Sequence, residues 1–247
     1  LMCQDELEGK EGITLVLNGD HPLFTKETLA ELITTHQETG AAATVLTAEV
    51  SDPTGYGRVI RREDGSVERI VEHKDATERE RLTKEISTGT FCFDNRKLFT
   101  ALRYVQNDSA QGEYYLPNVL TIFQQQGETI SALKIADEEE AMGVNDRLQL
   151  AKAEAYMRRK IIEKHMLNGV TIIHPENTYI EADVEIGIDT VIEPGTYLRG
   201  QTIIGEGCHI GPHADLNNVK VADGVRIQYA HIQNSEVADK VKIGPYA

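Results

Sequence analysis

Asp20 is the residue whose type and position most directly suggest chemistry. It ends the motif Asn18-Gly19-Asp20, which follows an apolar run of strand length at residues 12–17 and is followed by Pro22. Ligands of open α/β sheets bind beyond the carboxyl ends of the strands. A carboxylate at such a place is a hard oxygen ligand, suited to Mg²⁺ shared with substrate phosphates. An aspartate with Gly and Pro close by in the sequence is equally typical of an ordinary turn, so both interpretations stay open.

Two further polar residues are similarly ambiguous. Glu72, in the segment RIVEHKD (69–75), is either a ligand-binding carboxylate or a charge on a strand that leaves the sheet. Asn145 directly precedes a long helical pattern, where asparagine is a common N-cap. The sequence shows no Ser/His/Asp or Cys/His arrangement, and its 8 histidines lack metal-ligand spacing. The residues alone therefore predict a ligand-binding domain and no particular reaction.

Composition narrows the class of protein. The net charge of -15 over 247 residues argues against nucleic acid or an anionic membrane as a partner. The sequence has no signal-peptide pattern at its start and no apolar run of membrane-spanning length. Cys3, Cys92 and Cys208 have no C-x-x-C spacing, so we expect neither disulfides nor a zinc site, and a cytoplasmic location. A phosphorylated substrate would need local positive charge or a metal ion.

The elements that must position these residues alternate between strands and helices. Strands are expected at 12–17, 41–50, 88–94 and 128–136, with two more around the turn Glu63-Asp64-Gly65. Helices are expected at 25–40, with Thr25 as N-cap and Gly40 as its stop, and at 95–105 and 114–127. This alternation predicts a mostly parallel α/β sheet of Rossmann-like type.

The C-terminal part has a different period. Aliphatic residues occupy every sixth position, which fits neither a helix nor a single strand and is typical of a parallel β-helix. They are Ile180, Ile186, Ile192, Leu198, Ile204, Ile210 and Leu216. A second series two positions earlier is small or β-branched, as a crowded corner requires. After Leu216 the pattern shifts and resumes with Val219, Val225, Val237 and Ile243, broken at His231.

A long amphipathic helix at 145–169 is expected to connect the two parts. We therefore predict an α/β domain at 1–144, a linker helix at 145–169 and the first coils of a left-handed β-helix at 170–247. A solenoid needs a polar cap at its end, and this one ends in mid-repeat at Ala247. The sequence also begins at Leu1, so we expect a fragment at both ends.

Several motifs in this order resemble one family. They are LVLNGDHPL (15–23), DPTGYGRVIR (52–61), IVEHKDAT (70–77), NDSAQGEYYL (107–116), GVNDRLQLAKAE (143–154) and HMLNGVTIIHPENTYI (165–180). The chain resembles the bifunctional GlmU family, which combines N-acetylglucosamine-1-phosphate uridylyltransferase with glucosamine-1-phosphate N-acetyltransferase in bacterial peptidoglycan precursor synthesis. The resemblance covers essentially the whole chain.

The resemblance implies a reaction and a set of site residues. N-acetylglucosamine 1-phosphate attacks the α-phosphorus of UTP and releases pyrophosphate, while a second site transfers acetyl from acetyl-CoA to glucosamine 1-phosphate. It places Mg²⁺ on Asp20 and Asn145. It assigns UDP-N-acetylglucosamine contacts to the segments at the strand ends: Asn18, Gly19, Asp20, Gly57, Glu72, Ser87 and Asn145. It also implies a homotrimer built on the β-helix.

Three departures from the family pattern bear on activity. Ser87 replaces the usual asparagine, so an expected sugar contact becomes a shorter hydroxyl, and Asn18 replaces the usual Tyr or Cys, which leaves the contact near it open. The phosphate-binding loop and the uracil-binding segment would precede Leu1, and the acetyl-CoA site and catalytic histidine would follow Ala247. We therefore expect this polypeptide alone to be inactive in both reactions, with His209, His213 and His231 as surface or corner residues.

Two alternatives remain open. Other sugar nucleotidyltransferases with appended β-helices share the expected architecture, although AQGEYYL and GVNDR would be unusual in them. A scaffold without enzymatic activity could use the same fold. The joint presence of Asp20, Glu72 and Asn145 counts against a scaffold, because a scaffold needs no metal pair.

Overall fold

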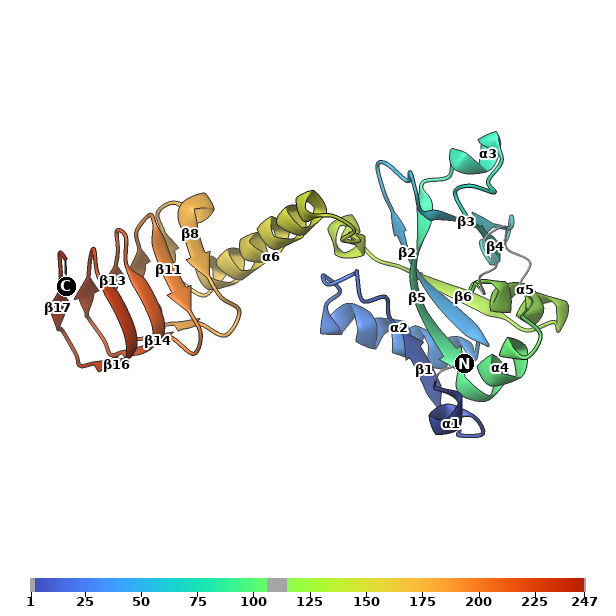
Figure 1. Ribbon diagram of the computed structural model, residues 1–247, viewed down its shortest axis with the longest axis horizontal. Coiled ribbons are helices and arrows are strands. Elements are labelled where there is room, and N and C mark those ends of the chain that lie inside the picture. The colour runs from blue at the N-terminus through green and yellow to red at the C-terminus, as the bar shows by residue number, and fades with distance from the viewer. Residues whose placement is uncertain (1–2, 106–114, 247) are drawn as a thin grey trace. The chain divides into compact units, whose positions relative to one another are not determined.

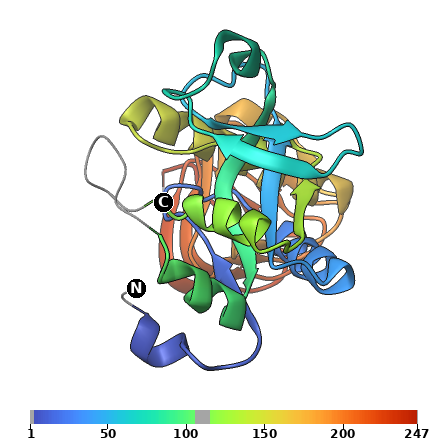
Figure 2. The same ribbon diagram turned by 90° about the vertical axis from the view of Figure 1, so that its right-hand side faces the viewer.

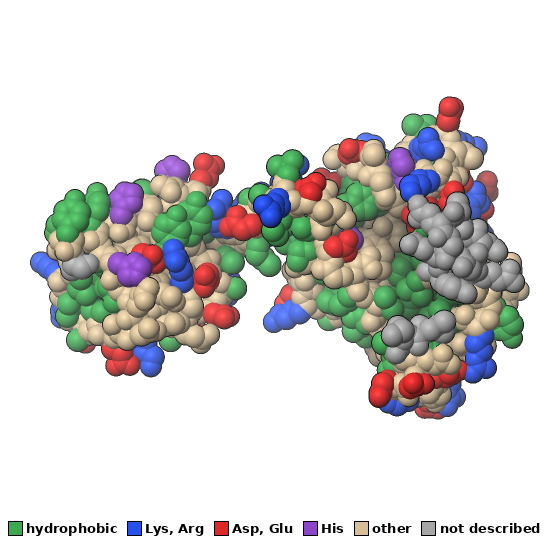
Figure 3. All heavy atoms as spheres, in the orientation of Figure 1, with side chains coloured by type: hydrophobic (Ala, Val, Ile, Leu, Met, Phe, Trp, Pro, Cys, Tyr) green, Lys and Arg blue, Asp and Glu red, His purple; other side chains and the backbone are tan. Residues whose placement is uncertain are grey.

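The chain folds into two compact units. The computed structural model describes residues 3–105 and 115–246, and the units are Leu1–Gln149 and Leu150–Ala247 (Figure 1). The division falls in the first turn of α6 (Arg147–Leu167). Acidic and basic side chains are interspersed over the face of each unit that Figure 3 shows. None of the helices in the described ranges is long and apolar enough to span a membrane.

The first unit alternates strands and helices. Its elements are α1 (Gln4–Leu7), β1 (Ile13–Val16), α2 (Lys26–Thr39), β2 (Ala43–Glu49), β3 (Gly57–Arg61), β4 (Val67–Val71), α3 (Glu78–Arg81), β5 (Glu85–Asp94), α4 (Asn95–Leu102), α5 (Asn118–Gln125), β6 (Ile130–Lys134) and the 3₁₀ helix η1 (Glu138–Ala141). The expected caps of α2 are present: Thr25 Oγ1 accepts from Thr28 N, and Gly40 has a φ of 58°. The helix expected at 114–127 begins at Asn118. Residues 106–114, which include most of the motif NDSAQGEYYL, lie outside the described part of the chain.

Strand β5 lies at the centre of the sheet. The strand order is β4-β3-β5-β2-β6, and β1 also pairs with β5. Strands β1, β2 and β6 run in one direction, and β5 runs antiparallel to both β1 and β2. The expected turn at Asp64-Gly65 closes the antiparallel hairpin of β3 and β4. Asp64 Oδ1 accepts from Ser66 N at 2.9 Å, and Gly65 has a φ of 82°, as a tight turn requires.

Helices cover both faces of this sheet because successive strand residues point to opposite sides. On β5, Phe91 and Phe93 pack in a cluster with Phe123 of α5. The residue between them, Cys92, packs instead with Leu32 of α2. Figure 2 shows α5 lying across the strands on the face turned toward the viewer. The sheet therefore forms the middle layer of an α/β/α arrangement.

The second unit is a β-helix preceded by α6. Its strands are short, and they pair in parallel with the next coil: β7 (Thr171–Ile172), β8 (Thr178–Ile180), β9 (Glu185–Ile186), β10 (Val191–Ile192), β11 (Thr196–Arg199), β12 (Ile203–Ile204), β13 (His209–Ile210), β14 (Asp215–Val221), β15 (Arg226–Ile227), β16 (His231–Val237) and β17 (Lys242–Ile243), with the 3₁₀ helix η2 (Pro175–Asn177).

The aliphatic series forms the core of this unit, as its period predicts. Ile180, Leu198 and Leu216 stand in register on neighbouring coils. Leu198 and Leu216 are fully buried. The second series fills the corners, where Thr190 Oγ1 donates to Gly205 O at 2.8 Å and accepts from Cys208 N at 3.0 Å. The corner is too small to admit water, so these bonds satisfy polar atoms that would otherwise be buried without a partner.

One detail of the expected pattern is wrong after Leu216. The sequence suggested that the aliphatic series is broken at His231, but the register pairs Leu216 with Ile232 and places His231 opposite Asp215. His231 is exposed, so it interrupts nothing in the core.

Shorter corners cause this shift. Val221 follows Leu216 by five positions rather than six, and the corner between them contains Asn218 with a φ of 55°. Ile232 likewise follows Ile227 by only five positions, and the next coil repeats the arrangement at Asn234, with a φ of 47°. Asparagine accepts the left-handed backbone more readily than most residues, which allows a turn with one residue less.

Candidate functional site

The candidate site is built around a change of partner along β5. The first half of β5 pairs with β3, where Ser87 stands opposite Gly57. The second half pairs with β1, where Phe91 stands opposite Val16. Gly89 lies between the two stretches with a φ of 75°. The carboxyl end of β1 therefore opens next to the hairpin of β3 and β4.

Gly89 is essential to this junction. A Cβ atom at this position would collide with the side-chain amide of Asn18, which follows β1. Its positive φ also disfavours any residue with a side chain. The absence of a side chain therefore lets Asn18 lie directly against β5, two residues from Ser87. The sequence assigned no role to Gly89, because its need for glycine depends on the pairing of distant strands.

Gly57 and Glu72 meet on the hairpin. A Cβ atom on Gly57 would lie 3.1 Å from Ile70 Cγ2 and 3.3 Å from Glu72 Oε1. The carboxylate of Glu72 thus rests against a stretch of bare backbone. Surrounding protein atoms raise the pKa of Glu72, and the charge of Asp75 raises it further. Such a carboxylate is well placed to accept hydrogen bonds from hydroxyl or amide N–H groups of a ligand.

A small cavity adjoins this carboxylate. It has a volume of about 180 Å³ and lies between the end of β4 and α5, with Glu72, Asp75 and Asn118 in its wall. Its wall thus includes carboxylate and amide side chains, which can hydrogen-bond to the hydroxyl groups of a ligand.

Asp20 and the segment before α6 are adjacent. Val144 N donates to Asp20 O at 2.8 Å, which brings Asn145 close to the turn that follows β1. The Asp20 carboxylate is paired with His21, whose Nδ1 lies 3.0 Å from Asp20 Oδ1. The His21 side chain is only 8% exposed and stacks on Phe24. The imidazole therefore orients the carboxylate, a role that the sequence did not indicate.

The side chain of Asn145 is not used as a helix cap. Asp146 Oδ1 accepts from Gln149 N at 2.7 Å and so caps the first turn of α6. Asn145 N donates to Gln149 Oε1 at 2.6 Å. The Asn145 residue is exposed, and its side-chain amide has no hydrogen-bond partner within residues 3–105 and 115–246. Asp146, rather than Asn145, is therefore the N-cap of α6.

The donor set of Asp20 and Asn145 fits Mg²⁺ only in part. One carboxylate and one amide oxygen are hard ligands, and a six-coordinate ion would need the remaining positions filled by water and substrate phosphates. Within the described residues, no group of three or more His, Cys, Asp and Glu side chains could hold a metal by itself. The chemistry of the pair thus suits an ion that arrives with a phosphorylated ligand.

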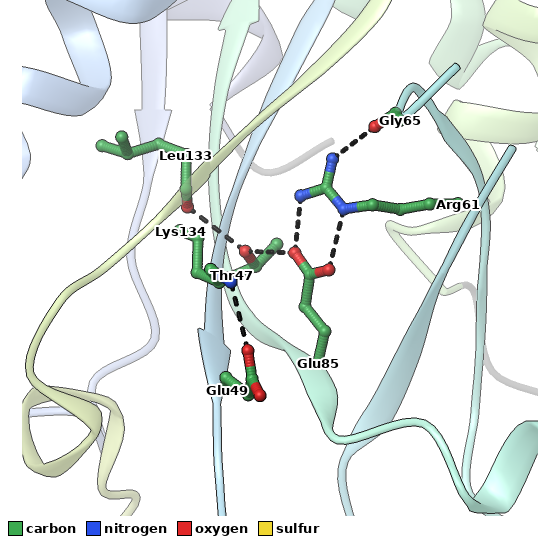
Figure 4. A network of polar contacts seen from close by, with 7 residues as sticks. All are labelled: Thr47, Glu49, Arg61, Gly65, Glu85, Leu133 and Lys134. Atoms are coloured by element: carbon green, nitrogen blue, oxygen red, sulfur yellow. Dashed lines mark hydrogen bonds and ion pairs between the residues drawn. The ribbon is translucent and has the colours of Figure 1, made fainter. Parts of the chain in front are cut away.

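A polar network holds the strands near Ser87 in register. Figure 4 shows the Glu85 carboxylate between Arg61 of β3 and Thr47 of β2. Arg61 Nε and Nη2 donate to its two oxygens at 2.8 and 2.6 Å, and Thr47 Oγ1 donates at 2.7 Å. Lys134 reaches Glu49 nearby at 3.1 Å. Glu85 therefore ties both neighbours of β5 together two residues before Ser87.

His209, His213 and His231 lie at the surface of the β-helix. His209 is paired with Glu193 at 3.1 Å, and His213 packs on the ring of Tyr229. His231 Nδ1 lies 3.4 Å from Asp215 Oδ2. Each contact is within one coil or between neighbouring coils.

Comparison with known proteins defines the class to which this fold and site belong. Residues 1–142 match the nucleotidyl transferase family, and residues 183–214 match the bacterial transferase hexapeptide, six repeats. The chain belongs to the nucleotidyl transferase family, with a hexapeptide-repeat β-helix as its second unit. The expected fold class is thereby confirmed.

Curated proteins similar to this chain define a narrower family than the family model does. The bifunctional protein GlmU of Halalkalibacterium halodurans is 53% identical over 247 residues, covering 100% of this chain and 54% of that protein. The proteins of the same name from Brevibacillus brevis and Listeria monocytogenes are 56% and 51% identical over 98% and 100% of this chain, which covers 52% and 54% of them. The resemblance to the GlmU family is confirmed, and the chain spans about half the length of these relatives.

Proposed function

We propose that this chain is part of a bifunctional enzyme of UDP-N-acetylglucosamine synthesis. Its first unit takes part in uridylyl transfer from UTP to N-acetylglucosamine 1-phosphate, with release of pyrophosphate. Its second unit carries the first coils of an acetyltransferase that uses acetyl-CoA and glucosamine 1-phosphate. The observation that carries the proposal is that Ser87 and Glu72 lie beside Gly57 while Val144, next to Asn145, is hydrogen-bonded to Asp20, in a chain 51–56% identical to GlmU proteins.

The residues divide into a sugar cradle and a phosphate end. Gly57, Glu72 and Ser87 form the cradle, in which the carboxylate and the hydroxyl accept and donate hydrogen bonds to the N-acetyl sugar. Ser87 is shorter than the asparagine usual in the family, so its contact includes a bridging water. Asn18 closes the cradle against Gly89. Together these groups orient the sugar phosphate for in-line attack, which is the main protein contribution to such transfers.

Asp20 and Asn145 would hold Mg²⁺ together with the nucleotide phosphates. When bound, the ion supplies neutralisation of phosphate charge. The chain's own contribution is to orient the two oxygen donors: His21 holds the Asp20 carboxylate, and the backbone bond from Val144 fixes the approach of Asn145. No covalent protein group is required.

The same proposal extends to assembly and location. The β-helix would bring three copies together, with each acetyltransferase site between neighbours, and the enzyme would act in the cytoplasm, where UTP and acetyl-CoA are available. Light scattering of the protein expressed from the complete reading frame should give the mass of a trimer.

Two coupled assays on that full-length protein test the function. One follows pyrophosphate release from UTP and N-acetylglucosamine 1-phosphate, and the other follows thiol release from acetyl-CoA and glucosamine 1-phosphate. We expect both activities. Asp20→Ala should reduce the first by about 10²-fold or more, with a higher Mg²⁺ requirement, and leave the second unchanged.

Asp64→Ala is the matched control, because Asp64 is an exposed aspartate in a turn of the same unit. It should leave both activities unchanged. Absence of both activities in the wild-type protein would refute the proposal and favour a scaffold. Turnover of UTP that survives Asp20→Ala at wild-type Mg²⁺ concentration would refute the metal assignment.

A further inference from the structure

Among the described residues of the first unit, Arg58 is the largest side chain that is completely buried. It is 1% exposed and follows Gly57 directly on β3. Its hydrogen-bond partners are a carbonyl and an imidazole, and its Nε has no partner. No carboxylate in residues 3–105 and 115–246 forms an ion pair with it. A buried cation without an ion-pair partner costs stability, so stability alone does not account for its presence.

The two partners of Arg58 flank the sugar cradle. One guanidinium nitrogen donates to the carbonyl of Tyr56, the residue before Gly57. Another lies 3.1 Å from Nδ1 of His73, the residue after Glu72. Because a guanidinium only donates, His73 must accept through Nδ1 and therefore carries its proton on Nε2. Arg58 thus connects the backbone of one cradle residue to the neighbour of the other.

Arg58 lies on the face of the β3–β4 hairpin opposite to the sugar cradle. Arg58 pairs with Val71 in the antiparallel hairpin, and successive side chains on a strand point to opposite faces. Glu72 lies on the face to which a Cβ of Gly57 would point. Arg58 is the following residue on β3, so its side chain lies on the other face, where it contacts His73 in the turn after β4. The guanidinium therefore supports the cradle from behind without contacting its ligand.

The surroundings of Arg58 are unfavourable to its charge. Burial lowers the pKa of Arg58, the positive charge of Arg81 lowers it further, and Asp52 opposes this only in part. Arginine nonetheless stays protonated in proteins. The protein therefore keeps a charged donor at this position against an energetic cost, and the guanidinium reaches two acceptors through different nitrogens.

We propose that Arg58 is a positioning residue that sets the separation of Gly57 and Glu72, and with it the affinity for the N-acetyl sugar phosphate. This inference rests on the proposed function. It assigns Arg58 to sugar binding rather than to the chemical step or to UTP. His73 acts with Arg58 as a second positioning residue, because it accepts the hydrogen bond of the guanidinium.

Steady-state kinetics of the full-length protein tests the assignment. Arg58→Met should raise KM for N-acetylglucosamine 1-phosphate by about 10-fold or more while KM for UTP and kcat change by less than about 3-fold. Arg58→Lys should be intermediate, because an ammonium can serve only one of the two acceptors well. His73→Ala should raise the sugar KM by about 3-fold or more, and His73→Asn should restore it through its amide oxygen.

Val59→Ala is the matched control, since Val59 is the next residue on β3, is 1% exposed and packs in the hydrophobic core. It should lower the melting temperature without changing the sugar KM. If Arg58→Met fails to fold, Arg58→Lys and the two His73 variants decide the question. An equal sugar KM in the Arg58 variants and in Val59→Ala overturns the proposal, as does an equal rise of KM for UTP.

Hydrogen exchange separates this inference from the proposed function. If the wild-type protein does not turn over UTP, the proposed function fails while the role of Arg58 can still be measured. Arg58→Met should then speed amide exchange in residues 72–76 more than Val59→Ala does. Equal exchange in the two variants overturns the positioning role.

Discussion

Replacing Glu85 by glutamine is the most direct test of how the register at Ser87 is held. The Glu85 carboxylate accepts two bonds from Arg61 and one from Thr47. A glutamine keeps the shape but replaces one oxygen by an amide nitrogen, which cannot accept from a guanidinium. Arg61 then loses one of its paired bonds and its counter-charge.

The expected cost follows from burial. The Glu85 side chain is 15% exposed and the Arg61 side chain 32% exposed, so solvent screens the pair only in part. Loss of one charge-assisted bond in such a setting costs about 1–3 kcal/mol. For a folding unit of this size, 2 kcal/mol lowers the melting temperature by about 4–8 °C.

The pH dependence gives a second signature. Burial opposes ionisation of Glu85, but hydrogen bonds from Arg61 and Thr47 and the charges of Arg61 and Lys134 outweigh it, so the pKa lies below its ordinary value of 4.5. The unfolded chain therefore takes up this proton at a higher pH than the folded one. The stability that the pair contributes is complete above pH 4.5 and is lost as the pH falls through the lowered folded value.

Urea denaturation of the whole chain, followed by circular dichroism, measures both effects. We expect the difference between wild type and Glu85→Gln to be full at pH 7 and to shrink below pH 4.5. Glu49→Gln is the matched control, because the pair of Glu49 and Lys134 is 60% and 51% exposed and should contribute at most about 0.5 kcal/mol. Equal losses in the two variants, or a difference that does not change with pH, would refute the reasoning.

Three further predictions concern the cradle, the β-helix and the thiols. Gly57→Ala places a methyl group 3.3 Å from a carboxylate oxygen and should lower kcat/KM for the sugar phosphate by about 10- to 100-fold in the full-length enzyme, without loss of the acetyltransferase rate. Leu198→Ala empties a fully buried core position and should destabilise the β-helix by about 3–5 kcal/mol in urea titrations; a loss under 1 kcal/mol would contradict the stacked core. Burial raises the pKa of Cys92 to about 11, so iodoacetamide at pH 7.5 should label exposed Cys3 and spare Cys92 and Cys208 until the protein unfolds, as peptide mass mapping would show.

Local chemistry made much of the fold predictable. A turn at Asp64-Gly65, a helix that begins after Thr25 and a core that repeats every six residues each depend on neighbours in the sequence. The five-residue corner at Asn218 escaped prediction for a related reason. When a corner is one residue shorter, the sequence still shows valines at the expected spacing. The valine in register with the aliphatic series is then Val221 rather than Val219.

Site residues that belong to a local sequence motif could be predicted. Those whose roles depend on the pairing of distant strands could not. Asp20 and Glu72 could be proposed from the type of side chain and the end of a strand. Gly89, His21 and Arg58 could not, because their roles arise from contacts between β1, β3, β4 and β5 that no local pattern encodes. The competing role of Asn145 as a helix cap was likewise decided only by the bond that Asp146 makes instead.

The packing of α6 determines where the β-helix could be cut out and fused to another domain. Its Ile162 belongs to the same hydrophobic cluster as the first coils of the β-helix, whereas the clusters of the first unit that the structure describes draw on residues up to Ala141. A gene fusion that transplanted the β-helix onto another catalytic domain would therefore have to include α6. A junction placed after the helix, at the apparent start of the repeats, would expose the core of the transplanted part.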